Sequence, residues 1–452
     1  MGDRRQDEPS GEPFDVAILG AGPVGVEAAL RSVADGYRTL LIGTVGEAVR
    51  SWGHVRMFTP WRMNTSDRGR TLLAQRGRAP LPPDDCPTGA ELVGEYLEPA
   101  VAALLAPPNG LLTHWPDASA TSVRRVGWPK RSGVGSAARA AALFEIDAGR
   151  LDRPTTRPKA VGDWPVDGPR VGAADRPQAR VVLDCTGTFT TEDCDGTPRL
   201  GVVGPDDAAR LRTGLKDWPV WQAETGSRVD RVLILGGGAS AATDAIALSD
   251  LGAGVTIATR GPAPAPVVDD DPLPNRAALF AAVRDRVASG QIEFRGGVTP
   301  ADAFSIGDDD RSPTVDDVRG GRRVRTVVRF RDSAGGLLSG GETFRDAFDV
   351  VVDDTGFEPD VSLFRELQVH LCYATEGPMR LAAHLMNQDA AAGGGPVDCL
   401  TQSGSDAGLL TTTEPGFFIL GSKSYGRRSN FLLRAGIEQV DAVFNSRRRE
   451  ER

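Results

Sequence analysis

The chain has 452 residues, of which 40% are hydrophobic, and this is enough for two domains with separate cores. The formal net charge is −9 and no long basic run is present, which argues against a nucleic-acid or anionic-membrane partner. No apolar stretch approaches the roughly 18 residues of a membrane span, and the polar start lacks the apolar core of a signal peptide. We therefore expect a cytoplasmic protein, with residues 1–13 forming a disordered tail.

A strand, a glycine-rich turn and a helix open the ordered part of the chain. The apolar run 14–19 precedes Gly20, Gly22 and Gly25 in the pattern Gly-x-Gly-x-x-Gly, and a helical pattern begins at Pro23. In a Rossmann unit these glycines make the tight turn, admit a pyrophosphate and allow close helix–strand packing. The helix N-terminus then offers N–H groups to the phosphates. The alternative is a turn without a ligand, but the flanking strand and helix favour a dinucleotide site.

The next strand, expected at 39–42, ends without the acidic residue that usually binds the adenosine ribose. Gly43 holds that place, and Glu47 is off position. We therefore expect ribose recognition to be weaker or different, with Thr44 as the candidate contact.

A second strand–turn–helix pattern begins at residue 231. Its candidate nucleotide contacts are Gly236, Gly238, Ser240 and Ala241, with alanine in place of the third glycine. The strand that follows leads to Arg260, whose guanidinium can pair with the 2′-phosphate of NADPH. The alternative is an ordinary exposed arginine at a strand end. The position favours NADPH over NADH.

Cysteine and histidine spacing argues against two further kinds of chemistry. The five cysteines contain no Cys-x-x-Cys pair, which weighs against a dithiol reductase of the thioredoxin reductase kind and, with the odd count, against a disulfide framework. The four histidines have no zinc-binding spacing, so no metal site is expected.

The order of the glycine turns and of two Thr-Gly segments resembles the two-dinucleotide-binding-domain flavoproteins, which include flavin-containing and N-hydroxylating monooxygenases and thioredoxin reductases. The first segment, 184–187, is similar to the family's Ala-Thr-Gly crossing between domains, and the second, 350–359, to its Ala-Thr-Gly-Phe-x-Pro. The family members bind FAD at the first turn and NADPH at the second. The resemblance implies cofactor contacts from Gly20, Gly22, Pro23, Gly25, Thr186, Gly187, Gly356 and Gly421.

The implied fold is α/β with two Rossmann-like dinucleotide-binding domains. The NAD(P)-binding domain, 222–345, is expected to be inserted into an FAD-binding domain formed by 14–221 and 346–452. One departure concerns the end of the chain, where Gly421 is followed by Ser422 instead of the family's aspartate. Together with Gly43, this removes two acidic contacts to FAD.

A narrower likeness, in segments 51–61, 87–93 and 420–427, is to monooxygenase-like flavoproteins, some of which are found in arsenic-resistance operons. It implies an NADPH-using flavin monooxygenase that acts on a small molecule, and it is compatible with a homodimer. The alternatives are a flavin-dependent reductase without oxygen insertion, and a degenerate binding protein that is not an enzyme. The missing acidic contacts favour the last of these.

The family's flavin ring usually lies near the segment that holds Arg56, Trp61 and Asn64. Trp61 would then stack on the ring or merely pack beneath it. Near the end of the chain, Lys423, Tyr425 and Arg427 either hold an anionic substrate or the flavin phosphate, or form a solvated basic loop.

Overall fold

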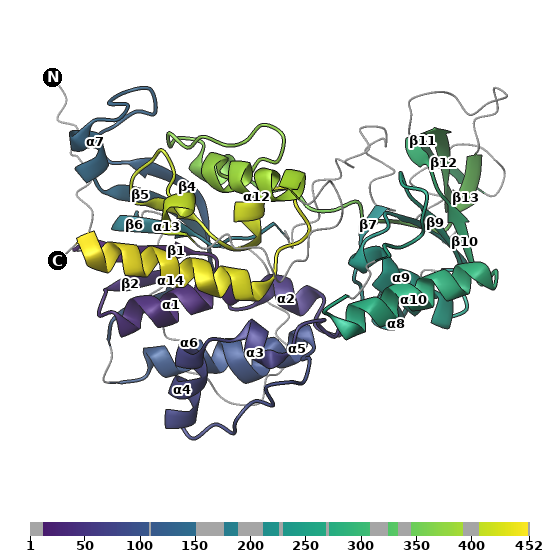
Figure 1. The fold of residues 1–452 in the computed structure, drawn as a ribbon, viewed down its shortest axis with the longest axis horizontal. Coiled ribbons are helices and arrows are strands. Elements are labelled where there is room, and N and C mark those ends of the chain that lie inside the picture. The colour runs from purple at the N-terminus through teal and green to yellow at the C-terminus, as the bar shows by residue number, and fades with distance from the viewer. Residues whose placement is uncertain are drawn as a thin grey trace. The chain divides into compact units, whose positions relative to one another are not determined.

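The computed structural model describes residues 12–107, 110–150, 176–188, 211–225, 229–267, 271–307, 324–332, 345–391 and 406–450, so the expected tail 1–13 lies almost wholly outside the described residues. The chain divides into two compact units (Figure 1). The first unit combines Met1–Phe189 with Phe357–Arg452, and the second unit is Thr190–Gly356.

A seven-stranded sheet forms the centre of the first unit, in the order β3-β2-β1-β6-β5-β4, with β15 also paired to β6. The pairs β1–β2, β2–β3, β1–β6 and β6–β15 are parallel, and β4 and β5 continue the sheet as antiparallel strands. The strands are β1 (Phe14–Leu19), β2 (Thr39–Ile42), β3 (Leu112–Trp115), β4 (Ala118–Arg125), β5 (Phe144–Arg150), β6 (Gln178–Asp184) and β15 (Phe417–Ile419).

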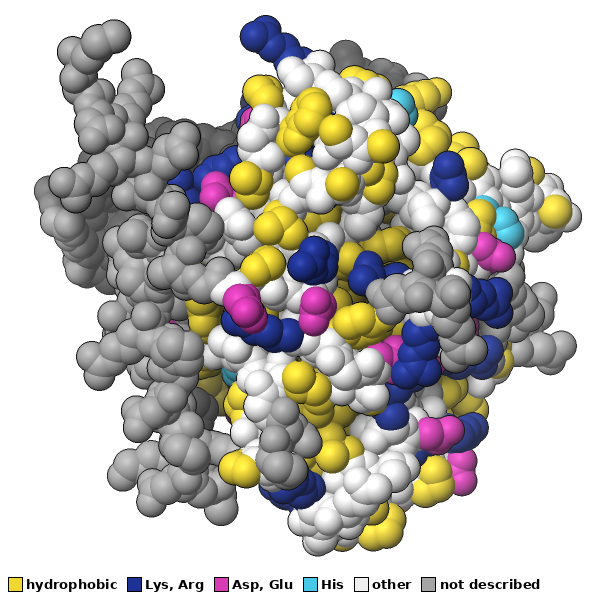
Figure 2. Space-filling model, turned by 90° about the vertical axis from the view of Figure 1, so that its left-hand side faces the viewer, with side chains coloured by type: hydrophobic (Ala, Val, Ile, Leu, Met, Phe, Trp, Pro, Cys, Tyr) yellow, Lys and Arg dark blue, Asp and Glu magenta, His cyan; other side chains and the backbone are white. Residues whose placement is uncertain are grey.

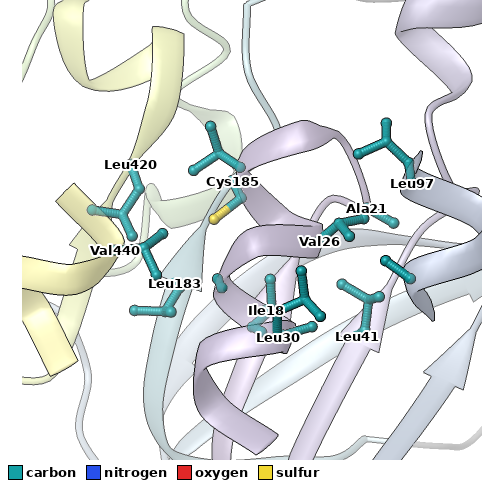
Figure 3. Packing of buried hydrophobic residues seen from close by; sticks show 14 of the residues in the cluster. Ile18, Ala21, Val26, Leu30, Leu41, Leu97, Leu183, Cys185, Leu420 and Val440 are labelled. Carbon is teal, nitrogen blue, oxygen red and sulfur yellow. The ribbon is translucent and has the colours of Figure 1, made fainter. Parts of the chain in front are cut away.

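The central parallel strands are apolar along nearly their whole length because both sheet faces are covered. On one face, side chains of β1, β2 and β6 pack against α1 (Pro23–Ala34) and α14 (Leu433–Glu450), as Ile18, Leu41, Leu30 and Val440 show in Figure 3. On the other face, residues such as Leu19 and Phe417 form a second core. Helices α1 and α14, far apart in the sequence, therefore lie side by side (Figure 1).

Helices of 3 to 18 residues complete the first unit. They are α1 (Pro23–Ala34), α2 (Glu47–Ser51), α3 (Trp61–Asn64), α4 (Asp67–Gln75), α5 (Gly89–Glu91), the π-helix η1 (Leu92–Leu97), α6 (Glu98–Leu105), α7 (Ala137–Ala141), η3 (Ser362–Phe364), α12 (Met379–Ala391), α13 (Ala407–Leu410), the 3-10 helix η4 (Gly421–Tyr425) and α14 (Leu433–Glu450).

The second unit is built on a five-stranded parallel sheet in the order β10-β9-β8-β14-β7. Its strands are β7 (Leu211–Thr213), β8 (Arg231–Leu235), β9 (Gly254–Ala258), β10 (Ile292–Arg295) and β14 (Val350–Asp353), and its helices are α8 (Trp218–Thr225), α9 (Ala239–Asp250) and α10 (Pro274–Ala288). One face packs on these helices, and the other on the antiparallel strands β11 (Val298–Gly307), β12 (Val324–Asp332) and β13 (Arg345–Phe348).

Two Rossmann-like units, one inserted in the sequence of the other, confirm the expected fold class. The domain boundaries expected at 222 and 345 fall inside the second unit, because β7 and β14 are strands of its sheet. Which cofactor each unit binds stays a prediction.

Charged and hydrophobic side chains share the surface drawn in Figure 2. Lys and Arg gather toward the right of that view, with some Asp and Glu among them, and hydrophobic side chains are spread over the rest of the described surface. Among the described residues, no helix is long and apolar enough to cross a membrane.

Candidate functional site: two glycine turns with a repeated design

The first glycine turn, residues 20–25, follows β1 and depends on two close backbone approaches. Gly20 has φ +95°, and a Cβ there would lie 2.7 Å from the carbonyl oxygen of Cys185. A Cβ at Gly25 would lie 1.9 Å from the carbonyl oxygen of Gly20. Both positions therefore require glycine for the turn itself, whether or not a ligand is bound.

Gly22 differs because space is open around it. It is the N-cap residue of α1 with φ −72°, and a Cβ built there meets nothing within 4 Å. No side chain caps this helix, Pro23 is at its start, and no acidic residue lies in its first turn. The N-terminus of α1 thus offers unpaired N–H groups and the positive end of the helix dipole to an anion. Gly22 and the first turn of α1 therefore fit a dinucleotide pyrophosphate.

A second turn, residues 184–187, closes β6 beside the first. The Asp184 Oδ1 atom accepts hydrogen bonds from the backbone N–H of Thr186 at 3.1 Å and from its hydroxyl at 2.7 Å. This side-chain-to-backbone turn leads into Gly187, with φ +72°. Because the amide and hydroxyl proton of Thr186 are already engaged, Thr186 offers an incoming cofactor mainly its carbonyl oxygen.

The last strand supplies the third segment of the site. Gly421 has φ +78°, and a Cβ there would lie 3.2 Å from Val24 in the first turn of α1. A Cβ at Gly187 would lie 3.4 Å from the hydroxyl of Ser422. The Gly20, Asp184 and Gly421 segments therefore meet at the carboxyl ends of β1, β6 and β15, where open α/β sheets bind their ligands.

Lys423 joins two of these segments. Its Nζ atom lies 2.8 Å from Asp184 Oδ2 and donates to the Thr186 hydroxyl at 2.9 Å. The two charged side chains are 2% and 0% exposed. This buried ion pair ties the end of β6 to η4, and its positive charge is already balanced by a carboxylate.

The expected basic cluster of the last loop is not assembled. Lys423 is paired as described, whereas Arg427 makes ion pairs with Glu358 and Glu376. Tyr425 is buried against Phe431, with ring centroids 5.3 Å apart. The solvated-loop alternative is therefore wrong for Lys423 and Tyr425, because both side chains are buried.

Tyr425 is a neutral group in the physiological range. Burial, and after it the charge of Glu438, raises the pKa of Tyr425 to about 12. The phenol therefore keeps its proton.

Two of the side chains expected beside the flavin ring lie in the core. Trp61 is 3% exposed within the cluster under α14, and Asn64 is 1% exposed. Asn64 donates to the carbonyl oxygen of Thr59 and accepts from its hydroxyl. This favours the packing alternative for Trp61. Arg56 is exposed, and it contacts the Cys86 carbonyl oxygen and, at 3.7 Å, Glu91.

The missing acidic residue after β2 has a conformational reason. Gly43 has φ +126°, which an aspartate or glutamate would adopt only with strain. The next residue, Thr44, donates its hydroxyl proton to the Pro116 carbonyl oxygen at 2.7 Å. Its oxygen remains an acceptor, so Thr44 stays a candidate contact for a ribose hydroxyl.

The second unit repeats the design of the first. Gly236 has φ +125°, and a Cβ there would lie 2.3 Å from the carbonyl oxygen of Asp354. Gly238 is the N-cap of α9, and a Cβ built there meets nothing within 4 Å. The Asp353 Oδ1 atom accepts from the Thr355 amide at 3.0 Å and its hydroxyl at 2.6 Å, and Gly356 follows with φ +109°.

The sequence signal for this repeat is Asp-x-Thr-Gly, at 184–187 and again at 353–356. The Thr-Gly of each segment is recognisable in the sequence, but the role of the preceding aspartate as the turn's acceptor depends on the folded backbone. Asp184 and Asp353, the acceptors of the two turns, are candidates that the sequence does not single out, and the same is true of the buried Asp244 and Asp354.

The remaining residues of the second turn differ in access. Ala241 is buried, and Ser240 is half-buried. Arg260 is exposed just beyond β9, and no ion pair to it is found among the described residues. Thr259 donates to the Gly261 carbonyl oxygen at 2.8 Å. Arg260 is thus available to a phosphate.

The cysteines of the described residues differ in their environment, and no cluster of possible metal ligands is found there. No group of three or more His, Cys, Asp or Glu side chains there is arranged to hold a metal. Within the described ranges, Cys86, Cys185 and Cys372 form no disulfide, and a hydrogen bond with Thr375 lowers the pKa of the Cys372 thiol. Cys185, beside the first turn, is buried, and burial raises its pKa well above the ordinary value, so its reactive thiolate form is suppressed.

The sequence matches no family model and none of the curated proteins compared with it. Solved structures do match. The bacillithiol disulfide reductase Bdr from Bacillus cereus is similar with a TM-score of 0.61 and 16% identity, over 96% of this chain and 98% of that chain. The Staphylococcus aureus enzyme of the same name gives 0.59 and 16%, over 98% and 100%.

Thioredoxin reductase from T. acidophilum is similar with a TM-score of 0.53 and 15% identity, over 97% of this chain and 99% of that chain. At these identities the likeness concerns the fold. The chain therefore has the two-domain Rossmann fold of these reductases along nearly its whole length.

Proposed function

We propose that the chain is an FAD-dependent oxidoreductase that takes its electrons from NADPH. The observation that carries the proposal is the repeated turn. In each unit a glycine with positive φ packs on the Asp-x-Thr-Gly backbone. A second glycine, with open space around it, is the N-cap residue of a helix that no side chain caps. Two such anion-binding turns in one chain suit two dinucleotides, with FAD at Gly22 in the first unit and NADPH at Gly238 in the second.

The residues of the chain would bind and orient these groups. Bound FAD would accept a hydride from NADPH and pass an electron pair to the substrate. The N-terminus of α1 would hold the pyrophosphate, and Gly43 would leave the ribose to Thr44. The Asp184–Lys423 pair would fix the relative positions of β6 and η4 beneath the cofactor.

For the reaction, we favour a flavin-dependent reductase without oxygen insertion. The similar solved structures named above are disulfide reductases, which supports this alternative over a monooxygenase. The chain has no Cys-x-x-Cys pair, and Cys185 is buried with a raised pKa. We therefore propose direct reduction of a small-molecule acceptor, without a dithiol of the protein.

A monooxygenase is the second candidate, supported by the likeness of segments 51–61, 87–93 and 420–427 to monooxygenase-like flavoproteins. The two reactions differ in their use of oxygen. Anaerobic turnover of NADPH with a candidate acceptor supports the reductase, and oxygen consumption coupled to a hydroxylated product supports the monooxygenase.

The flavin spectrum tests the proposal as a whole. We expect the purified protein, after incubation with FAD and gel filtration, to carry a yellow chromophore that NADPH bleaches under anaerobic conditions. A protein that stays colourless with added FAD would support the degenerate binding protein and overturn the proposal. The elution volume in the same experiment tests the homodimer.

Arg260 provides a prediction on the choice of nucleotide. At low nucleotide concentration, flavin reduction is expected to be about tenfold faster with NADPH than with NADH. The reason is that one charge-assisted contact to the 2′-phosphate is worth about 1.5 kcal/mol at an exposed site. The variant Arg260→Ala should lose most of this ratio, as measured by stopped-flow absorbance with both nucleotides.

The control is Arg434→Ala, which removes an exposed arginine of α14 in the first unit. It should keep the wild-type ratio. Equal rates with the two nucleotides in the wild type would remove Arg260 from the cofactor site and leave the fold untouched.

A further inference from the structure

Two carboxyl groups meet inside the second unit. Asp244 projects from α9, and Asp354 follows β14. A Cβ at Gly214, just after β7, would lie 2.0 Å from Asp354 Oδ1 and 2.5 Å from Asp244 Oδ2. The two side chains therefore converge on one point, and only glycine leaves room for them there.

Hydrogen bonds hold Asp244 in a single orientation. Its Oδ1 atom accepts from the Trp218 indole N–H at 2.8 Å, and its Oδ2 atom from the Leu215 backbone N–H at 2.7 Å. Leu215 has φ +60°, a conformation that costs a leucine free energy and that this bond helps to hold. Asp244 is 1% exposed.

Two buried carboxylates in contact cannot both ionise near neutral pH. Burial, and then the charge of Asp244, raises the pKa of Asp354 well above its usual range, and Asp353 adds to the effect. Burial raises the pKa of Asp244 to about 6, although its hydrogen bonds and Lys216 oppose the rise. Asp354 Oδ2 is buried without a hydrogen-bond partner among the described residues, as suits a neutral carboxyl group.

This carboxylate pair, Asp244 and Asp354, is directly attached to the second glycine turn. The Asp354 N–H donates to the Leu235 carbonyl oxygen at 2.8 Å, and the Asp354 backbone is what Gly236 packs against. On the other side, Asp244 belongs to α9, whose N-terminus follows Gly238. A change in the pair would therefore act on both sides of the turn.

We propose that Asp244 and Asp354 hold one proton between them and act as positioning residues for the second glycine turn, so that binding of NADP(H) weakens when the proton is lost. Loss of the proton to solvent places two negative charges beneath an anion site and drives β14 from the Gly214–Leu215 segment. The inference rests on the proposed function of the turn and adds its dependence on pH.

The test compares the wild type with Asp354→Asn, whose amide N–H takes the place of the shared proton. The probe is NADP⁺, titrated calorimetrically from about pH 5.5 to about pH 8.5. We expect the ratio of the wild-type to the variant Kd to rise by about fivefold or more across this range. Taking the ratio at each pH cancels the titration of the nucleotide's own phosphate.

Two further variants make the result decisive. Asp244→Asn removes the second carboxylate, and although it leaves the N–H of Trp218 or Leu215 without its acceptor, its Kd should change with pH as that of Asp354→Asn does. Having two variants covers the case in which one fails to fold. Asp250→Asn, at the end of the same helix and in an exposed ion pair with Arg286, should follow the wild type. A ratio of the wild-type Kd to the Asp354→Asn Kd that does not change with pH overturns the inference.

Failure of the proposed function looks different, because then no variant binds NADP⁺ at any pH. Thermal unfolding without nucleotide tests the shared proton independently. The folded pKa is raised, so the folded chain keeps a proton that the unfolded chain has lost, and stability falls as pH rises. The wild type should thus lose Tm relative to Asp354→Asn toward high pH, and parallel curves would show that no proton is shared.

Discussion

Lys423→Met is expected to lower the free energy of unfolding of the first unit by about 3 kcal/mol, because it leaves Asp184 buried without its cation. The Asp184 side chain is 0% exposed, so water cannot replace the ammonium without a rearrangement of η4. Asp184 Oδ1 keeps its two hydrogen bonds from Thr186, and the expected loss is therefore at the lower end for a broken buried pair.

Denaturant unfolding without cofactor would measure this loss as a lower midpoint at an unchanged slope. The double variant Asp184→Asn/Lys423→Met removes both charges and should recover most of the stability, since a neutral pair needs no compensation. Lys130→Met removes an exposed lysine of the same unit and should cost less than about 0.5 kcal/mol. A Lys423→Met midpoint no lower than that of Lys130→Met would mean that the pair is solvated.

The glycine turns could be predicted from the sequence because their geometry is local. Gly20 and Gly236 need positive φ and a close backbone approach, and these demands appear directly as glycine at fixed spacing after an apolar strand. The same holds for the helices that follow and for the parallel strands β1, β2, β8 and β9. The fold class follows from two such patterns in one chain.

The partners of charged side chains could not be predicted, because they depend on segments far apart in the sequence. Lys423 meets Asp184 only when β15 pairs with β6, and Arg427 meets Glu358 and Glu376 across a turn. Trp61 shows the same limit, because the sequence pattern around an aromatic residue is the same whether the ring stacks on a ligand or packs in a core.

Short strands form the edges of the sheet in the second unit, and they too could not be predicted from the sequence. Strand β7 has three residues, too few for a periodic pattern, and it is recognised only by its pairing with β14. Placing it in the sheet also brings Gly214 against Asp244 and Asp354, so the carboxylate pair was hidden for the same reason.

Gly22→Val is expected to weaken FAD binding by about a hundredfold or more while the fold remains intact. A Cβ at Gly22 meets no atom within 4 Å, and φ −72° suits a valine, so the protein itself does not oppose the substitution. A pyrophosphate seated on the N-terminus of α1 would be displaced by the isopropyl group and lose charge-assisted hydrogen bonds of about 1.5–3 kcal/mol each.

Gly238→Val is the matched variant, because Gly238 also caps its helix, with φ −83° and no atom within 4 Å of a Cβ. If each unit holds its own dinucleotide, Gly22→Val should lose bound flavin and keep NADP⁺ binding, whereas Gly238→Val should keep flavin and lose NADP⁺. Flavin absorbance after gel filtration and calorimetric titration of NADP⁺ read the two sites separately. Wild-type flavin content in Gly22→Val would place FAD elsewhere, and loss of both ligands in either variant would mean that the substitution disturbs more than its own turn.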